Sequence, residues 1–387
     1  MSVKHQASRF EFDELYTNLL KEAEKRNVTR IRGQGEMEGL EIFDYTQSCQ
    51  FDKQWNDYNI VARGLVVCPA EKRIVALPFA KFFNYGEISD SLPAMNFRAT
   101  CKMDGSLGIA YFWKGQWRVN TRGSFTSPQS KWATKRLQEF ASKLVPGNTY
   151  LFEIIYPENR VVIQYDFSAL VLLGAYTAEG EEFEHEDLQV LGTETGMAVV
   201  KTFACTSLTE LLQAVKDMDE TEEGVVVRFE NGYRVKIKGD KYVELHRMIS
   251  DIRPLCIWES LLFKKPDNIS KIPEEFVKDY TQIRNILAAR EQAQLKELED
   301  LAAKYQSLTD KEIGVQFVQI KKENPLGKFL FDYRKGKFLT DYERIDLTKS
   351  EPVTILRRSF FDMFRPDRNV LPGYTPSSSM NLFEEDV

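Results

Sequence analysis

The sequence predicts an α+β fold, with a domain dominated by antiparallel strands followed by an all-helical C-terminal domain. Between residues 40 and 240, short runs rich in Val, Ile, Phe and Tyr alternate with turn residues, which is typical of strands. After about residue 246 these runs stop, and apolar residues recur at helical intervals instead. This change predicts two domains, at residues 1–246 and 247–365, and a flexible tail at 366–387.

The first expected element is an amphipathic helix over residues 10–25. Its apolar residues are helically spaced: Phe12, Tyr16, Leu19 and Ala23. The strands are predicted from the runs IVARGLVVC, RIVAL, SLGIAYFW, QWRVNT, TYLFEIIY, RVVIQY, ALVLLGAYT, GVVVRFE and YRVKIK. Helices are expected to interrupt them at 129–143 and near 207–217. The acidic run EGEEFEHED at 179–187 is typical of a solvated loop.

In the C-terminal region, two further helices are predicted. The first is indicated by apolar residues with helical spacing at Phe276, Tyr280, Ile283 and Leu287. The second opens with a capping box, in which Thr309 is followed three residues later by Glu312, and it ends before Pro325.

The composition is that of an ordinary soluble protein of 387 residues with a net charge of −6. The five cysteines have no CxxC spacing, which favours reduced thiols in the cytoplasm. The N-terminus has no apolar signal segment, and no window reaches the ~18 apolar residues of a membrane span. The negative charge argues against tight, sequence-independent coating of nucleic acid, although it allows a local basic groove.

The segment CKMDGSLGI places Lys102 just before an Asp-Gly pair. Asp-Gly between two strand-like runs is a strong hairpin signal, so Asp104 and Gly105 are expected to form a tight turn. This turn would fix Lys102 at the end of a strand.

Other charged residues stand at or inside predicted strands. Glu153 interrupts an apolar run, and Glu223 directly precedes a Val-rich strand. Arg234, Lys236 and Lys238 alternate and therefore share one face of a strand, with Arg234 expected to be a peripheral solvated charge. Isolated carboxylates and lysines of this kind predict a site for polyphosphate and a divalent metal.

Four motifs in order resemble those of the covalent nucleotidyltransferases: KMDG, LFEII, EEGVVV and VKIK. KMDG alone is a weak signal, but the ordered series is much stronger. From about residue 40 to 250 the sequence most closely resembles the RNA ligase 1 family, whose founding member is a phage tRNA-repair ligase. Further family-like positions are Arg63 in ARGLVV, Lys81 and Phe83 in LPFAKFFNYGE, Arg122 in NTRGSF (lysine in the phage protein), Tyr242 in KYVELH, and Asp267 in KKPDN.

The resemblance implies an ATP-dependent RNA ligase that joins 5′-phosphate and 3′-hydroxyl RNA ends, with ATP and Mg²⁺ or Mn²⁺ as cofactors. In this family the nucleophile, here Lys102, forms a lysyl-AMP, and AMP then passes to the RNA 5′ end. The substrate is expected to be RNA, in particular broken tRNA, with an end-healing kinase-phosphatase as a possible partner. The protein is expected to be a cytoplasmic monomer without membrane association, whose helical domain selects the RNA.

The resemblance also assigns roles to single residues. Lys236 and Lys238 would stabilise charge on the α-phosphate, Glu153 would accept the ribose hydroxyl, and Phe83 would pack near adenine. The remaining nucleotide-binding positions would be Arg63, Lys81, Asp104, Gly105, Arg122 and Tyr242. Glu223 is the expected metal ligand, and Asp267 a second one.

Lys102 must lose its proton before it can attack, because a lysine amine with a pKa near ~10.4 is protonated at neutral pH. We expect a nearby divalent cation and the charges of Lys236, Lys238 and Arg122 to lower its pKa.

Two alternatives are retained. A DNA ligase or capping guanylyltransferase would usually carry an OB-fold after the last lysine motif, where this sequence indicates helices. An inactive nucleotide- or RNA-binding module would be expected to have lost part of the motif series, which is intact here. The basic residues Lys131, Lys135 and Arg136 are more typical of an exposed helix face than of an RNA groove.

Overall fold

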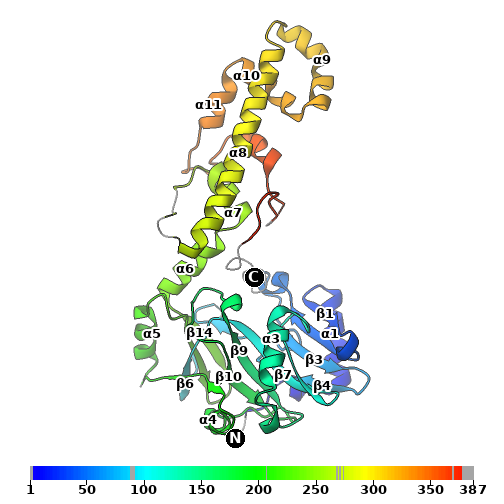
Figure 1. Ribbon diagram of the computed structural model, residues 1–387, viewed down its shortest axis with the longest axis vertical. Coiled ribbons are helices and arrows are strands. Elements are labelled where there is room, and N and C mark those ends of the chain that lie inside the picture. Colours follow the sequence, from blue (N-terminus) through cyan, green and yellow to red (C-terminus); the bar gives the residue numbers. More distant parts are fainter. Residues whose placement is uncertain are drawn as a thin grey trace. The chain divides into compact units, whose positions relative to one another are not determined.

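A computed structural model describes residues 3–87, 92–205, 207–266, 269, 272, 274–367 and 370–376 (Figure 1). Asp267 lies outside these residues, so its predicted metal role stays a prediction. The chain divides into two compact units, whose described residues fall within 1–246 and 247–381. Within the described ranges, no helix has both the length and the apolar character needed to cross a membrane.

The first unit contains three sheets. Sheet 1 has the order β1 (Val28–Arg32), β2 (Glu41–Tyr45), β3 (Arg63–Cys68) and β4 (Arg73–Ala76). Sheet 2 has the order β11 (Ala198–Val199), β10 (Ala169–Tyr176), β9 (Thr149–Ile155), β7 (Ser106–Trp113) and β8 (Gln116–Asn120). Sheet 3 has the order β12 (Thr202–Phe203), β6 (Phe97–Cys101), β13 (Gly224–Phe229), β14 (Arg234–Lys238) and β5 (Phe83–Asn84). Most strand pairs are antiparallel, which confirms the predicted fold class.

Helices join and flank these sheets. They are α1 (Phe12–Glu24), α2 (Gln47–Phe51), α3 (Pro128–Leu137), α4 (His185–Thr195), α5 (Leu208–Asp217) and α6 (Asp240–Ser250), which crosses the unit boundary. Short 3₁₀ helices occupy Gln6–Arg9, Gly35–Met37, Ala141–Lys143 and Pro157–Asn159. The helix expected at 129–143 is therefore shorter than predicted, and the strand expected at RVVIQY (160–165) is wrong, because these residues form no strand. In this unit β1, β2, β5, β11, β12, α2, α4 and α6 were not predicted.

The core of sheet 3 lies on one face only, because its strands alternate strictly. Val225, Val227, Val235 and Ile237 point to an apolar cluster that α5 covers with Leu211 and Val215. The charged residues of β14 therefore share the opposite face, as the alternation predicted. That opposite face carries the site.

The predicted Asp-Gly hairpin is wrong. The strand before it, β6, pairs with β12 and β13, whereas the strand after it, β7, pairs with β8 and β9. Residues 102–105 thus pass from sheet 3 to sheet 2 with a bend at Gly105. The local signal failed because a short dipeptide does not determine which partners two flanking strands find in the fold.

The second unit is helical in its described part. Its helices are α7 (Pro254–Leu262), α8 (Glu274–Lys304), α9 (Asp310–Glu323), α10 (Leu330–Arg334), α11 (Lys337–Glu343) and α12 (Ile355–Phe361), with 3₁₀ helices at Pro325–Phe329 and Asp362–Phe364. The predicted capping box at α9 is present, with Thr309 and Glu312 bonded reciprocally. An aromatic core of Phe338, Tyr342, Phe360 and Phe361 surrounds the buried Arg357. The described residues of this unit show isolated bridges but no sheet, so the five strands of an OB-fold are not found among them.

Candidate active site

Lys102 lies where the chain leaves β6, and its backbone is fixed to the start of β13. Its N–H donates to the carbonyl of Gly224 at 2.8 Å. Its Nζ donates to Oε2 of Glu223 at 2.6 Å. Two motifs that are 121 residues apart in the sequence therefore meet through both main-chain and side-chain bonds.

Glu223 is a buried carboxylate between two lysines. Its side chain is 2% exposed, and its second oxygen, Oε1, lies 2.9 Å from Nζ of Lys238. Gly224 allows the start of β13 to lie close to the end of β14, which carries Lys238. Its φ is +140°, and a Cβ at this position would lie 2.1 Å from the carbonyl oxygen of Ile237. Burial alone would raise the pKa of Glu223, but the charges of Lys102 and Lys238 hold it below its usual value. Glu223 is therefore an ionised group.

The pKa of Lys102 does not shift in the predicted direction. Burial lowers it, but the carboxylates of Glu223 and Glu153 outweigh that effect, and the net pKa is above the usual value. The prediction considered the neighbouring cations and a metal ion, and it omitted the two carboxylates that the fold places beside the amine. In this state the Lys102 amine is protonated.

A strongly lowered lysine pKa is found at Lys236, not at Lys102. Burial, followed by the charges of Lys81 and Lys102, lowers the pKa of Lys236 to about 7. Lys238 and Arg63 act in the same direction. A lysine under such repulsion favours binding of an anion, because an anion would relieve the repulsion.

Glu153 comes from sheet 2, in the middle of β9, a strand buried along its whole length. It lies opposite Leu107 of β7 and Val171 of β10, and it is 9% exposed. Gly105 packs directly against it, since a Cβ at Gly105 would lie 3.2 Å from the Glu153 Cγ and 2.6 Å from the carbonyl oxygen of Ile154. The predicted need for glycine at residue 105 thus has a steric reason within the protein itself.

Asp104, predicted to bind the nucleotide, has both carboxylate oxygens engaged by the chain. Oδ2 accepts the backbone N–H groups of Val162 and Ile163, each at 2.7 Å, and Oδ1 accepts the hydroxyl of Tyr242 at 2.8 Å. Tyr242 is 1% exposed and lies under Lys238, with Nζ 5.2 Å from the ring centroid. Asp104 and Tyr242 therefore brace the segment that carries Lys102.

A second group of predicted residues comes from the start of β3, the segment after β8 and the segment that leads into β5. Arg122 pairs with Asp44 at 3.1 Å and stacks on Tyr45, with its Cζ 4.5 Å from the ring centroid. Arg63 stacks on Phe82 in the same way, at 5.4 Å. Asp44 and Tyr45 were not predicted, and no local motif marks them. Phe82 lies inside the predicted motif LPFAKFFNYGE, but no role was assigned to it.

Lys81 is buried in an aromatic setting formed by Tyr45, Trp55 and Phe83, with its Nζ 5.1–5.5 Å from the three ring centroids. Burial lowers its pKa, and the charges of Arg63 and Arg122 act in the same direction. Phe83, predicted to pack near adenine, packs edge to face on Trp55, and its ring contacts the amine of Lys81. Phe82, not Phe83, lines the pocket.

One pocket of about 290 Å³ brings the predicted residues together. Its lining includes Arg63, Lys81, Lys102, Asp104, Gly105, Arg122, Glu153, Glu223, Lys236, Lys238 and Tyr242. A volume near 300 Å³ is at the lower end of the range for small-molecule pockets. Of the thirteen predicted residues, these eleven line the pocket. Phe83 does not line it, and Asp267 lies outside the described residues.

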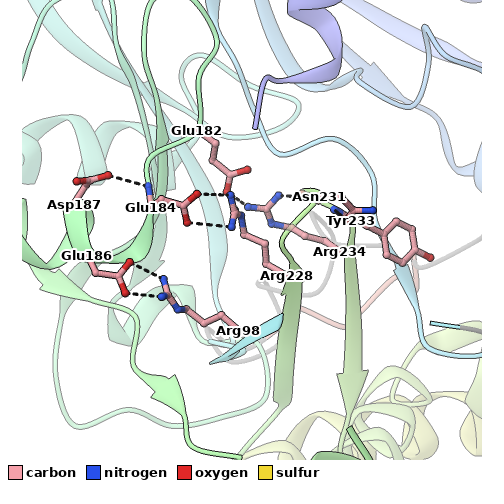
Figure 2. Close-up of polar contacts among 10 residues, drawn as sticks. Arg98, Glu182, Glu184, Glu186, Asp187, Arg228, Asn231, Tyr233 and Arg234 are labelled. Atoms are coloured by element: carbon pink, nitrogen blue, oxygen red, sulfur yellow. Dashed lines mark hydrogen bonds and ion pairs between the residues drawn. The ribbon is translucent and has the colours of Figure 1, made fainter. Parts of the chain in front are cut away.

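The pocket also extends to three arginines that the sequence did not predict as part of it (Figure 2). Arg98, Arg228 and Arg234 project from the same face of sheet 3 and meet glutamates from the segment before and at the start of α4. Arg234 is not the solvated charge that was predicted, because it pairs with the buried Glu182 and stacks on Phe79. The acidic run at 179–187 is likewise not a solvated loop, since Glu182 is buried and His185 begins α4. Sequence alone did not show that these opposite charges meet.

The residues present fit a divalent cation bound together with a nucleotide. Among the described residues, no group of three or more His, Cys, Asp or Glu side chains is placed to ligate a metal by itself. Mg²⁺ is usually held by one or two carboxylates with phosphate oxygens and water as the other ligands. Glu223 is the ionised carboxylate beside Lys102 that suits this type of binding.

The sequence model of a family described as RNA ligase matches residues 61–242. An RNA ligase of Rhodothermus phage RM378 is 24% identical over 343 residues, which cover 67% of this chain and 77% of that protein. A putative bifunctional polynucleotide kinase/RNA ligase of Autographa californica nuclear polyhedrosis virus is 24% identical over 220 residues. That alignment covers 49% of this chain, and the chain spans only 31% of the viral protein.

Among solved structures, an archaeal ATP-dependent RNA ligase is similar over 88% of this chain and 83% of its own, with a TM-score of 0.45 and 14% identity. The family match includes every motif from Arg63 to Tyr242. The predicted resemblance to RNA ligases is therefore confirmed for the segment that forms the pocket.

Proposed function

We propose that this chain, whose residues 61–242 match the RNA ligase family, is an ATP-dependent RNA ligase that joins 5′-phosphate and 3′-hydroxyl ends. The observation that carries the proposal is the Lys102–Glu223–Lys238 cluster, closed by bonds of 2.6 and 2.9 Å beside a lysine whose pKa is about 7. A nucleophile, an ionised carboxylate and a triphosphate-binding surface are thereby collected in one pocket.

In the proposed first step, Nζ of Lys102 attacks the α-phosphorus of ATP. A nitrogen–phosphorus bond forms, the bond to the β-phosphate oxygen breaks, and pyrophosphate leaves. Lys236 and Lys238 face the charge that develops on the α-phosphate oxygens. Binding of the triphosphate raises the pKa of Lys236 from about 7, so that this lysine is fully protonated when its charge is needed.

The Lys102 amine must lose a proton before this attack, and Glu223 affects the pKa at which it does so. While Glu223 is paired only with lysines, it holds the pKa of Lys102 above the usual value. A divalent cation bound at Glu223 would supply charge that competes for this carboxylate and stabilises the phosphate oxygens. Glu153 lines the same pocket and is near enough to Lys102 to raise its pKa, and there it is suited to accept the ribose hydroxyls.

In the later steps, AMP would pass from Lys102 to the 5′-phosphate of RNA, and a 3′-hydroxyl would then displace AMP. We further propose a broken tRNA as substrate, Mg²⁺ or Mn²⁺ as the metal, and an end-healing kinase-phosphatase as partner. The viral relative is named as a putative bifunctional polynucleotide kinase/RNA ligase, which supports a kinase as partner. We propose that the helical second unit selects the RNA.

The proposal is tested by incubating the protein with ATP labelled at the α-phosphate and with Mg²⁺ or Mn²⁺. We expect a label on the protein that is stable to base and labile to acid. Lys102→Ala should abolish it, whereas Lys135→Ala, at an exposed position of α3, should not change it. Absence of label from the unmodified protein would refute the proposal, and labelling by GTP but not ATP would indicate a capping enzyme.

Substrate choice is tested by joining 5′-phosphate RNA as linear single strands, nicked stem-loops and nicked duplexes. We expect the nicked stem-loop to be sealed fastest. Preference for the nicked duplex would contradict the tRNA-repair proposal.

A further inference from the structure

Part of the pocket lining is a link between the two sheets that carry the site. Glu182 belongs to sheet 2 through its backbone: it forms an antiparallel bridge with Tyr176, the last residue of β10. Its N–H also donates to the carbonyl of Val3 at 2.9 Å. Because the next residue, Phe183, donates to the carbonyl of Ala175, the backbone of Glu182 is held firmly against this sheet.

The side chain of Glu182 reaches across to sheet 3. Its Oε1 accepts Nε of Arg228 at 2.9 Å and also accepts Nη2 of Arg234. Arg228 and Arg234 lie directly opposite each other on β13 and β14, so one carboxylate oxygen joins both strands (Figure 2). We call these three residues the Glu182 bridge. The carboxylate is 4% exposed, and the arginines are 19% and 13% exposed.

The strands joined by the Glu182 bridge carry the reacting groups of the proposed function. On sheet 3, Lys236 follows Arg234 by two residues on the same face of β14. On sheet 2, β10 pairs with β9 so that Val171 lies opposite Glu153. The separation between Glu153 and Lys236 therefore depends on how the two sheets are held, and both residues line the same pocket as the Glu182 bridge.

We propose that Glu182 is a positioning residue for lysyl-AMP formation, which sets the spacing between Glu153 on sheet 2 and the lysines on sheet 3. This inference rests on the proposed function. A buried ion pair is a poor source of net stability, because desolvation offsets much of the attraction, but its geometry is demanding. A carboxylate that must reach two arginines at once tolerates little displacement of either sheet. Displacements of ~1 Å in a catalytic site cost on the order of 10²-fold in rate.

The test is single-turnover transfer of AMP from labelled ATP to the full chain, in which the rate constant at saturating ATP is measured separately from the labelled fraction. Glu182→Gln keeps the size of the side chain but weakens both ionic bonds, and we expect its rate constant to fall at least tenfold. Glu182→Asp keeps the charge on a shorter side chain and should recover part of the rate. The matched control is Glu184→Gln, because Glu184 is half exposed and, among the described residues, forms an ion pair with Arg228 but not with Arg234. Its side chain also caps α4, a contact to a backbone N–H that the glutamine oxygen can still accept.

A purely structural role for Glu182 would lower the melting temperature and the labelled fraction, but the molecules that remain folded would react at the normal rate. That result, or an equal loss in Glu184→Gln, would overturn the positioning role. If Glu182→Gln does not fold, the rate constant of the folded Glu182→Asp decides: a rate within twofold of the unmodified protein contradicts the proposal. Absence of label from the unmodified protein would instead refute the proposed function.

Discussion

Two cations on the same face of β14, separated by one residue, are in opposite environments. Arg234 is paired with Glu182 and stacked on Phe79, so its charge is compensated within the protein. Lys236 is affected mainly by burial and by other cations, which lower its pKa to about 7. We call the part of sheet 3 with Arg98, Arg228 and Arg234 the arginine end, and the part with Lys236 and Lys238 the lysine end. The charges of the arginine end are compensated within the protein and contribute to the structure. The charge of Lys236 at the lysine end is poorly compensated, which favours binding of an anion.

The largest effect is expected at Glu223, whose carboxylate pairs with both Lys102 and Lys238. Glu223→Gln should slow lysyl-AMP formation by about 10³-fold, since the carboxylate beside the nucleophile and its metal-binding capacity are both lost. The pH dependence should also change. Glu223 raises the pKa of Lys102, so removing its charge should lower that pKa relative to the unmodified protein, although Glu153 still raises it. The acidic limb of the residual rate should therefore move to lower pH.

The control for this change is Glu222→Gln, one residue earlier and exposed. Its rate and pH profile should match those of the unmodified protein. A Glu223→Gln profile that stays in place, or moves to higher pH, would mean that Glu223 does not set the pKa of Lys102.

Lys236→Met should separate activity from stability. We expect lysyl-AMP formation to fall by about 10²-fold, the usual cost of losing one group that stabilises developing charge. The melting temperature should rise at the same time. The pKa of Lys236 is about 7 in the folded state and near 10.5 in the unfolded state, so protonation opposes folding. This penalty is complete below pH 7 and disappears as the pH rises toward 10.5.

The gain in melting temperature should therefore be largest at pH 6 and absent near pH 10.5, as measured by thermal unfolding across this range. Each kcal/mol corresponds to about 2–4 °C for a unit of this size. A loss of stability at pH 6 would show that Lys236 is compensated in the same way as Arg234.

Arg234→Met should give the reverse pattern, because it removes a compensated charge. We expect the unfolding free energy to fall by about 3 kcal/mol, since the carboxylate of Glu182 stays buried with only Arg228 as partner. Urea denaturation measures this loss. The control is Arg136→Met in the exposed pair with Glu139, for which a loss below about 1 kcal/mol is expected. Equal losses in both variants would remove the distinction between the buried and the exposed pair.

The smallest effect is expected at the rim of the arginine end. Arg98 and Glu186 form a two-bond pair, but the Glu186 side chain is 66% exposed. Glu186→Gln should change the unfolding free energy by less than about 0.5 kcal/mol, and this small change should shrink further in high salt. If Glu186→Gln instead lost more than about 1 kcal/mol of unfolding free energy at every salt concentration, Glu186 would contribute to stability as a buried group does, like Glu182.

The fold class and much of the pocket could be predicted because their signals are local. Alternation along β14 determines that Lys236 and Lys238 share a face, and the period change near residue 246 marks where helices replace strands. The capping box at Thr309 was equally reliable, since two residues three positions apart, Thr309 and Glu312, satisfy it. The hairpin at Asp104 failed because strand pairing is not local: β6 finds its main partner in β13, more than 120 residues later.

By itself the sequence determined which chemical groups are available and in what order: Lys102, Glu153, Glu223 and the lysine pair. Only the tertiary structure decided how their charges act on one another. It placed two carboxylates beside Lys102, which raises that pKa, and it left the low pKa to Lys236. It also turned the acidic run into partners for three arginines. Electrostatic effects depend on burial and on distances of a few ångströms, and neither is a property of residue order.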